Sequence, residues 1–297
     1  MKNGILCMNK PQGFTSFDVI GKLRGILKIK RLGHSGTLDP MATGVLPIFV
    51  GTATKCCDIL PNDDKSYIAG FKLGSTTDTQ DSTGKVIREY PSRDITSQDI
   101  ESVLSRFIGD IEQVPPMYSA VSINGKRLYE LARKNITVER PSRKIMIYNI
   151  KLLSYDRTSQ TGSLEISCGK GTYVRTIIND IGETLNIGGY MTSLVRTSAS
   201  GFTLNDCYTF EDVQNAISNN TIDSLIVPTE VIFKDLPKIY LTEEQTKAYR
   251  NGVKLPLSEV SIKQDILEYT IYSHDNIFIG TGKIDLDDNI LRVGKNF

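Results

Sequence analysis

Strand-like and helical segments follow one another in this chain without regular alternation, and this order most restricts the architecture that it can adopt. Residues 5–8 and 45–50 are short apolar runs, and residues 65–73 alternate in the manner of a half-buried strand. A doubly wound fold would instead place a helix after each strand. We therefore predict an α+β fold with a mixed, mainly antiparallel sheet and flanking helices.

Helix signals stand between these strand-like runs. Thr15 or Ser16 can cap a helix that runs to about Leu27, Thr96 opens a second helix that Gly109 stops, and a third spans residues 173–185. The apolar side chains at helical spacing are Phe17, Ile20, Leu23 and Leu27 in the first, Ile100, Val103, Leu104 and Phe107 in the second, and Val174, Ile177, Ile178, Ile181 and Leu185 in the third. A further short helix is expected over residues 52–60, before Pro61.

Turn and linker signals divide the remaining chain. Asn124-Gly125 is a strong hairpin signal, and strand patterns fill residues 137–168. Prolines near residues 228–240 suggest a boundary between a first domain of residues 1–230 and a second of residues 238–297.

The second domain is predicted to be small and rich in β-strands. Thr242 and Gln245 form a capping box at the start of a helix that Gly252 ends. Strand-like runs follow at residues 267–272, 277–280 and 290–293.

Bulk composition restricts the functional classes only weakly. The 297 residues include 35 Lys and Arg against 34 Asp and Glu, so any surface for nucleic acid must be local. Five scattered cysteines without a C-x-x-C pair, and only two histidines, indicate neither a disulfide framework nor a zinc site; we expect buried, reduced thiols and no metal or cofactor. No stretch resembles a signal peptide or a membrane span, so a cytoplasmic protein is expected.

The segment RLGHSGTLDPMATGVLPI, residues 31–48, places a single carboxylate, Asp39, in a sharply bent stretch before an apolar run. Taken alone, Asp before Pro is typical of a turn. The glycines do not follow the pattern of a phosphate-binding loop. His34, Ser35 and Asp39 supply the residue types of a hydrolase triad, but neighbours on one loop do not easily converge, and a glycosidase would need a second carboxylate.

Four ungapped segments carry longer motifs. They are GHSGTLDPMATGVLPI (33–48), DKSYIAGFKLGSTTDTQDSTG (64–84), QVPPMYSAVSINGKRLYELAR (113–133) and CGKGTYVRTIINDIG (168–182). Together they resemble the TruB family of tRNA pseudouridine synthases, whose loop has the form G-H-x-G-T-L-D-P-x-A-T-G-V-L-P. The resemblance covers about residues 3–202, whereas the tail resembles the PUA-like RNA-binding module of the family only loosely.

The resemblance implies an enzyme that isomerises a flipped-out uridine in RNA, breaking the C1′–N1 bond and joining C1′ to C5. Asp39 matches the essential carboxylate, which could attack C1′, attack C6 or remove the C2′ proton; the sequence does not choose among these. An ordinary Asp is ionised at neutral pH, so its pKa need not be shifted. Arg175 matches the guanidinium that pairs with it, and Tyr67 matches the active-site tyrosine that stacks on the uracil.

The same resemblance assigns further residues to the substrate. Tyr173 and Leu194 match base-pocket residues, and His34 matches a loop histidine that holds the flipped RNA. Asp78 is expected to serve turn chemistry, whereas Asp81 is expected to reach the site.

Three positions depart from the family pattern. Ser122 stands where the family often has Lys, and Tyr190 and Val195 stand where the strand motif has His and Arg. The last two remove polar or basic groups that could touch RNA.

A local basic segment suggests where RNA binds. Residues 126–144 contain seven basic and two acidic side chains; the predicted backbone contacts are Lys126, Arg127, Arg133 and Lys134. Such runs are often merely solvated faces. By resemblance to bacterial members, we expect a monomer that acts on uridine 55 in the T arm of tRNA without a guide RNA. The alternatives are a guide-dependent relative with another substrate, or an inactive RNA-binding protein.

Overall fold

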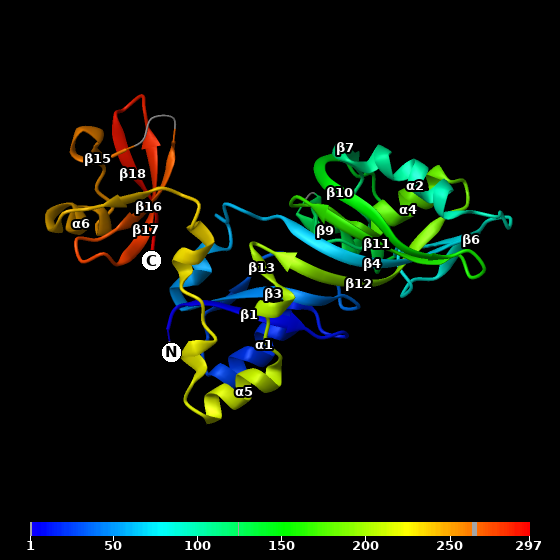
Figure 1. Ribbon diagram of the computed structural model, residues 1–297, viewed down its shortest axis with the longest axis horizontal. Helices are drawn as coiled ribbons and strands as arrows, with labels where there is room; N and C mark the ends of the chain where they lie inside the picture. The colour runs from blue at the N-terminus through cyan, green and yellow to red at the C-terminus, as the bar shows by residue number, and fades with distance from the viewer. Residues whose placement is uncertain (1, 124, 263–265) are drawn as a thin grey trace.

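The computed structural model describes residues 2–123, 125–262 and 266–297, and its largest element is a twisted sheet (Figure 1). The strand order is β1-β3-β12-β4-β11-β10-β7, with β2 beside β3 and β13 beside β12. The strands are β1 (Gly4–Lys10), β2 (Leu32–His34), β3 (Thr43–Val50), β4 (Lys65–Leu73), β7 (Gly109–Gln113), β10 (Arg143–Asp156), β11 (Thr161–Cys168), β12 (Gly189–Ala199) and β13 (Phe202–Thr203). These pairings are antiparallel except for the short parallel pairing of β3 with β12, which confirms the predicted fold class.

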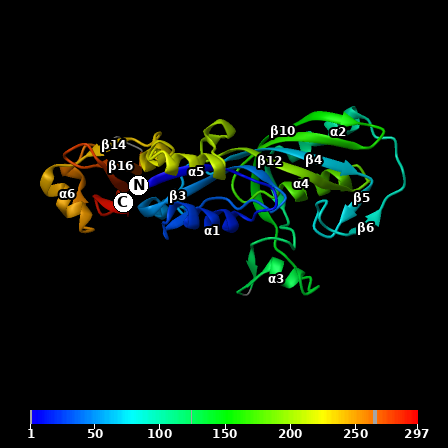
Figure 2. The ribbon, with the colours of Figure 1, turned by 90° about the horizontal axis from the view of Figure 1, so that it is seen from below.

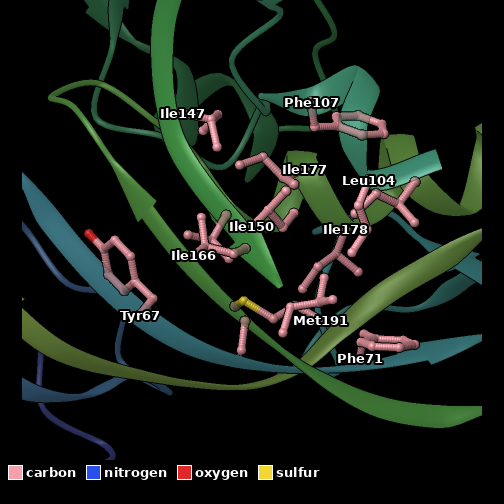
Figure 3. Packing of buried hydrophobic residues seen from close by; sticks show 14 of the residues in the cluster. Tyr67, Phe71, Leu104, Phe107, Ile147, Ile150, Ile166, Ile177, Ile178 and Met191 are labelled. Carbon is pink, nitrogen blue, oxygen red and sulfur yellow. The ribbon is translucent and has the colours of Figure 1, made fainter. Parts of the chain in front are cut away.

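Helices flank this sheet at its two ends. α1 (Ser16–Leu27) and α5 (Phe210–Ser218) lie beside β1 and β3, and α2 (Ser97–Leu104) and α4 (Val174–Thr184) lie beside β10 and β12 (Figure 1). The predicted stripe of α4 is buried in the cluster that also contains Tyr67, whose hydroxyl points away from the apolar side chains (Figure 3). Capping boxes start α1, α2 and α5, because a Thr hydroxyl and an Asp carboxylate three residues later satisfy each other's backbone N–H groups.

Several local predictions were wrong. Phe17 is 66% exposed, because Val19, Ile20 and Leu23 face the core and the Phe17 ring lies on the outer side, under the Arg24 guanidinium. The segment 52–60 forms only a 3₁₀ turn over Gly51–Cys56.

Two other predicted boundaries shift. α2 ends at Leu104, and a 3₁₀ turn over Ser105–Phe107 follows before Gly109 begins β7. The strand pattern predicted from residue 137 begins only at Arg143, so residues 137–142 are irregular.

Two small hairpins extend from the main sheet. One is β5 (Ser75–Thr77) with β6 (Val86–Glu89). The other is β8 (Ser122–Ile123) with β9 (Lys126–Arg127), as the Asn-Gly signal predicts, although Asn124 itself lies outside the described residues. α3 (Leu128–Ala132) follows, and this segment projects from the rest of the molecule (Figure 2).

A second sheet lies in the C-terminal part of the chain. Its order is β14-β16-β17-β18-β15. The strands are β14 (Lys238–Tyr240), β15 (Leu255–Pro256), β16 (Glu268–Tyr272), β17 (Phe278–Asp285) and β18 (Ile290–Asn296). α6 (Glu243–Arg250) begins with the predicted capping box of Thr242 and Gln245. Phe233, Phe278 and Phe297 pack against the β1–β3 side of the main sheet, so the two sheets share an apolar contact.

The cysteines are all free thiols. Cys7, Cys56 and Cys168 are buried as expected, whereas Cys57 and Cys207 are partly exposed. Within the described ranges, no helix is both long and apolar enough to cross a membrane.

Candidate active site

The loop between β2 and β3 carries Asp39 and is held by backbone contacts on both sides of that residue. The Ser16 hydroxyl accepts a hydrogen bond from the Leu38 N–H at 2.8 Å and donates to the Leu38 carbonyl at 3.3 Å. The Pro40 carbonyl accepts from the Gly13 N–H at 2.8 Å and from the Lys10 ammonium at 3.3 Å. The backbone on either side of Asp39 is therefore fixed by the start of α1 and the end of β1.

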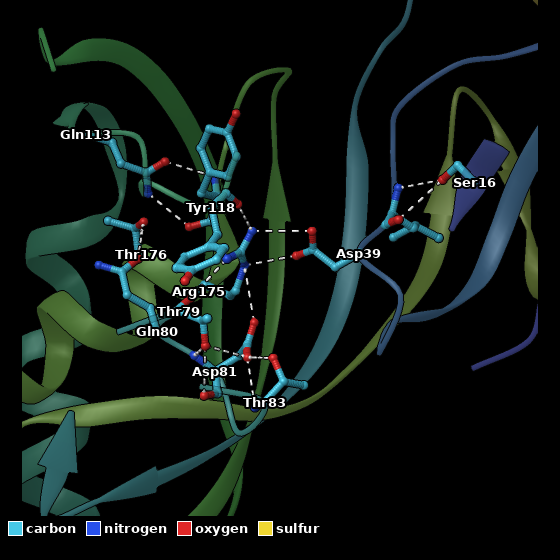
Figure 4. Close-up of polar contacts among 12 residues, drawn as sticks. Ser16, Asp39, Thr79, Gln80, Asp81, Thr83, Gln113, Tyr118, Arg175 and Thr176 are labelled. Carbon is cyan, nitrogen blue, oxygen red and sulfur yellow. Dashed lines mark hydrogen bonds and ion pairs between the residues drawn. The ribbon is translucent and has the colours of Figure 1, made fainter. Parts of the chain in front are cut away.

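Asp39 faces Arg175 across the site, as the sequence predicts (Figure 4). Arg175 Nε lies 2.9 Å from Asp39 Oδ2, and Arg175 Nη2 donates to Asp39 Oδ1 at 3.3 Å. The guanidinium also donates to the carbonyls of Thr79 at 3.0 Å and Tyr118 at 2.8 Å. Arg175 is buried, whereas the Asp39 side chain keeps 36% of its surface exposed. The pair is thus a two-point contact that leaves one side of the carboxylate open.

Opposing effects set the pKa of Asp39. Burial raises the pKa of this carboxyl above its ordinary value, the Arg175 guanidinium lowers it, and the charge of Asp81 raises it again. The net direction is upward, which differs from the unshifted value assumed from the sequence. Arg175 is the largest influence that favours the ionised form.

A pocket of about 290 Å³ opens beside this pair. Tyr67 from β4, Leu194 from β12 and Tyr173 at the start of α4 line it together with Asp39 and Arg175, so the structure brings these five predicted residues together. The Gln113 side chain accepts from the Tyr173 N–H and donates to its carbonyl, which fixes the start of α4. Burial raises the pKa of Tyr67 to about 12, so its hydroxyl is neutral at pH 7.

Asp81 and His34 lie outside the lining of this pocket in the described structure. Asp81 is buried behind Arg175, 3.8 Å from its Nε, and accepts hydrogen bonds from Thr79 and Thr83. It therefore reaches the site through Arg175. His34 lies on β2; burial and the Arg196 charge lower its pKa, which favours the neutral imidazole.

Arg196 is a residue of the site that the sequence analysis missed. It is fully buried, and it donates from Nε to the Val45 carbonyl at 2.7 Å and from Nη1 to the Gly36 carbonyl at 2.9 Å. These carbonyls lie on either side of Asp39 in the sequence, so one guanidinium joins both arms of the loop. A usable signal was present: Leu194 and Arg196 share one face of a strand, so an inward Leu predicts an inward Arg.

Two loop glycines permit this arrangement. A Cβ on Gly44, which has φ +103°, would lie 2.2 Å from the Arg196 carbonyl oxygen. A Cβ on Gly36, with φ +66°, would lie 2.8 Å from Lys65 Cε. At Gly44 any other residue would combine backbone strain with a clash against backbone, whereas at Gly36 the positive φ is the main obstacle, because the end of the Lys65 side chain can shift.

The predicted RNA-binding residues lie on the projecting segment near the pocket. Lys126 and Arg127 form β9, Arg133 and Lys134 follow α3, and all four are exposed. Ser119, just before this segment, lines the pocket. The segment that carries these basic side chains therefore begins at the wall of the pocket.

The remaining predicted details concern turns and substituted positions. Asp78 accepts a hydrogen bond from the Lys85 N–H at 2.8 Å, which fits its predicted turn role. Ser122 is exposed, and Tyr190 and Val195 are partly buried on β12. Among the residues that the structure describes, no group of three or more His, Cys, Asp or Glu side chains is placed to hold a metal ion.

Comparison with known proteins identifies the family. Residues 24–174 match the N-terminal domain of TruB family pseudouridylate synthases, and residues 175–234 match the C-terminal domain of tRNA pseudouridylate synthase B. The chain belongs to the TruB family. It is therefore an isomerase of the pseudouridine synthase class.

Individual relatives agree with this assignment. A tRNA pseudouridine synthase B of Lactobacillus gasseri is 45% identical over 264 residues, covering 87% of this chain and 88% of the relative. Its counterpart in Bacillus licheniformis is 45% identical over 259 residues, covering 86% and 84%. A solved Cbf5-Nop10-Gar1 complex contains a chain with a TM-score of 0.76 and 24% identity, covering 99% of this chain and 84% of that one; this likeness concerns the fold alone.

Proposed function

We propose that this protein isomerises uridine 55 in the T loop of tRNA to pseudouridine, alone and without a guide RNA. The observation that carries the proposal is the Asp39–Arg175 pair, which leaves one face of an ionisable carboxylate open to a pocket of about 290 Å³. Relatives of the TruB family named tRNA pseudouridine synthase B support tRNA as the substrate.

Asp39 is proposed to act as the carboxylate at the sugar or the base. Arg175 favours its ionised form and, being anchored by two backbone carbonyls, holds it in one orientation. In the overall reaction C1′ exchanges its bond to N1 for a bond to C5, while C5 loses a proton and N1 gains one. Attack at C1′, attack at C6 and removal of the C2′ proton all require this ionised carboxylate.

The pocket walls are proposed to hold the uracil while it is detached. Tyr67 can stack on the base, and its neutral hydroxyl can exchange a hydrogen bond during proton transfer at C5. Tyr173 and Leu194 enclose the base from α4 and β12. His34, as a neutral imidazole, is proposed to hold the RNA in its flipped conformation.

RNA backbone contacts are assigned to the projecting segment and to the second sheet. Lys126, Arg127, Arg133 and Lys134 would neutralise phosphates of the T arm. Residues 1–230 would act as the catalytic domain, and residues 238–297 as a PUA-like RNA-binding domain. We propose a monomer that works in the cytoplasm, where its tRNA substrate is found.

The deciding experiment uses the purified full-length chain. Unmodified tRNA and the same tRNA with uridine 55 replaced by cytidine are incubated with it, and pseudouridine is mapped chemically. Modification at position 55 alone supports the proposal. Pseudouridine elsewhere would indicate another substrate class, and tight binding without any product would indicate an inactive RNA-binding protein.

A further inference from the structure

A second pocket, of about 360 Å³, adjoins the one that contains Asp39. Asp63 and Gly169 line both pockets, and Lys170 lies between Gly169 and Gly171, which both line the first. The two pockets therefore adjoin and share part of one wall. An RNA strand whose uridine occupies the first pocket can therefore place a neighbouring nucleotide in the second.

Tyr148, on β10, gives the second pocket an aromatic wall. Its side chain is 51% exposed, and its hydroxyl donates to Asp64 Oδ1 at 2.8 Å. The hydrogen bond restrains an otherwise exposed ring. A restrained, accessible ring is the surface on which proteins stack unpaired bases.

The charges of the second pocket suit a nucleotide more than a simple anion. Lys144 and Lys170 are exposed lining residues and can approach phosphate. Asp64 and Asp110 offer carboxylate oxygens, whereas Asp63 pairs with Lys65 at 2.5 Å. Carboxylates accept hydrogen bonds from the exocyclic amines of bases, as they do from the amine of cytosine.

We propose that the second pocket binds the base of a nucleotide next to the isomerised uridine, stacked on Tyr148, with a preference for a base that carries an exocyclic amine. Lys170 neutralises the phosphate that joins the two nucleotides. This inference rests on the proposed function, because it requires an RNA strand whose uridine occupies the Asp39 pocket.

The test combines Tyr148→Ala with T-arm stem-loop RNAs in which the nucleotide on the 5′ or the 3′ side of the target is abasic, cytidine or uridine. Pseudouridine formation is measured under single-turnover conditions with the full-length chain. Leu153→Ala is the matched control, because Leu153 is a 45% exposed side chain on the same strand and lies outside the pocket lining.

On an RNA with cytidine at the bound position, Tyr148→Ala should lower kcat/KM roughly tenfold, the loss expected when one stacking platform is removed. On the abasic RNA at that position the variant and the wild type should differ little, and Tyr148→Phe should retain most of the activity. If the losses caused by Tyr148→Ala and by the abasic nucleotide were additive on both the 5′ and the 3′ side of the target, the proposed subsite would be wrong. Equal activity on RNAs with uridine and with cytidine at the bound position would contradict the amine preference. A wild type that forms no pseudouridine on any RNA would instead refute the proposed function.

Discussion

Replacing Arg175 by Met is the sharpest test of how the protein controls its carboxylate. The substitution keeps an unbranched apolar side chain but removes the guanidinium, with its two contacts to Asp39 at 2.9 and 3.3 Å and its two hydrogen bonds to backbone carbonyls. Breaking a fully buried ion pair costs about 3–5 kcal/mol. Because Asp39 is 36% exposed, solvent screens part of this interaction, and we expect a loss of roughly 1–3 kcal/mol in transition-state stabilisation.

That loss corresponds to a fall of about 5- to 150-fold in kcat/KM at neutral pH. The pH profile should change as well. Burial already raises the pKa of Asp39, and Arg175 opposes that rise, so its removal raises the pKa further. The ionised fraction of Asp39 then falls at any given pH, and the acid limb of the activity profile moves to higher pH.

The measurement is the pH dependence of pseudouridine formation, scored by tritium released from C5-labelled uridine in tRNA. Arg175→Lys is the control, since it keeps the charge but not the two-point geometry; its acid limb should move less than that of Arg175→Met. Binding of tRNA, measured by filter retention, should change little in either variant. An acid limb that stays in place in Arg175→Met would show that this guanidinium does not act on Asp39 through its charge.

Four other outcomes are expected. Asp39→Asn should abolish isomerisation and leave the tRNA dissociation constant within a few-fold of the wild-type value, since phosphate contacts carry most of the affinity. Full turnover by the pure variant would exclude Asp39 as the essential carboxylate. Tyr67→Phe should keep base stacking and slow product release, whereas Tyr67→Leu should lose roughly 1–3 kcal/mol of stacking; wild-type kinetics in both would make the ring a packing residue. Joint replacement of Arg133 and Lys134 by Gln should weaken tRNA binding and make it less dependent on salt, with little change in the turnover rate at saturating tRNA. If plots of log affinity against log salt concentration coincided for variant and wild type, these two residues would not contact phosphate. Burial lowers the pKa of Lys10 to about 8, so the wild type should gain stability relative to Lys10→Met as pH rises from about 8 to the ordinary lysine value, by at most about 3 kcal/mol because solvent screens part of the effect; a difference between the two proteins that stays constant with pH in urea titrations would contradict this.

The sequence predicts those elements whose signals are local. Residues 65–73 were assigned correctly to β4, and the capping threonines start α1, α2 and α6 where expected. Phe17 shows the limit of periodicity. The apolar residues of this helix are compatible with two overlapping buried faces, one that includes Phe17 and one that does not, and only the position of the sheet decides between them. The 3₁₀ turn over Gly51–Cys56 could not be distinguished from an α-helix in the sequence, because its buried residues, Ala53 and Cys56, are three positions apart, a spacing that fits both kinds of helix.

The predicted site residues divide in the same way. The structure places Asp39, Arg175 and Tyr67 around one pocket, and the motif resemblance had pointed to them because all three stand in the quoted motifs. Lys10 and Arg196 were missed. Their partners are backbone carbonyls, which every residue has, so no sequence pattern marks the contacts themselves. For Arg196, the alternation with Leu194 indicates an inward side chain but not its partners.

These missed contacts explain how a loop of small and bent residues can hold a carboxylate in one place. Lys10 binds the carbonyl of Pro40, Ser16 binds both backbone groups of Leu38, and Arg196 joins the loop arms at Gly36 and Val45. Each support comes from a different element of the main sheet or its first helix, so the loop geometry depends on the completed fold. A carboxylate fixed in this way need not be reoriented when substrate binds, and preorganisation of this kind lowers the cost of reaching the transition state. The role proposed for Asp39 therefore rests on its fixed position as much as on its ionisation, and this is how a single Asp in an apparently ordinary Asp-Pro turn could carry the proposed chemistry.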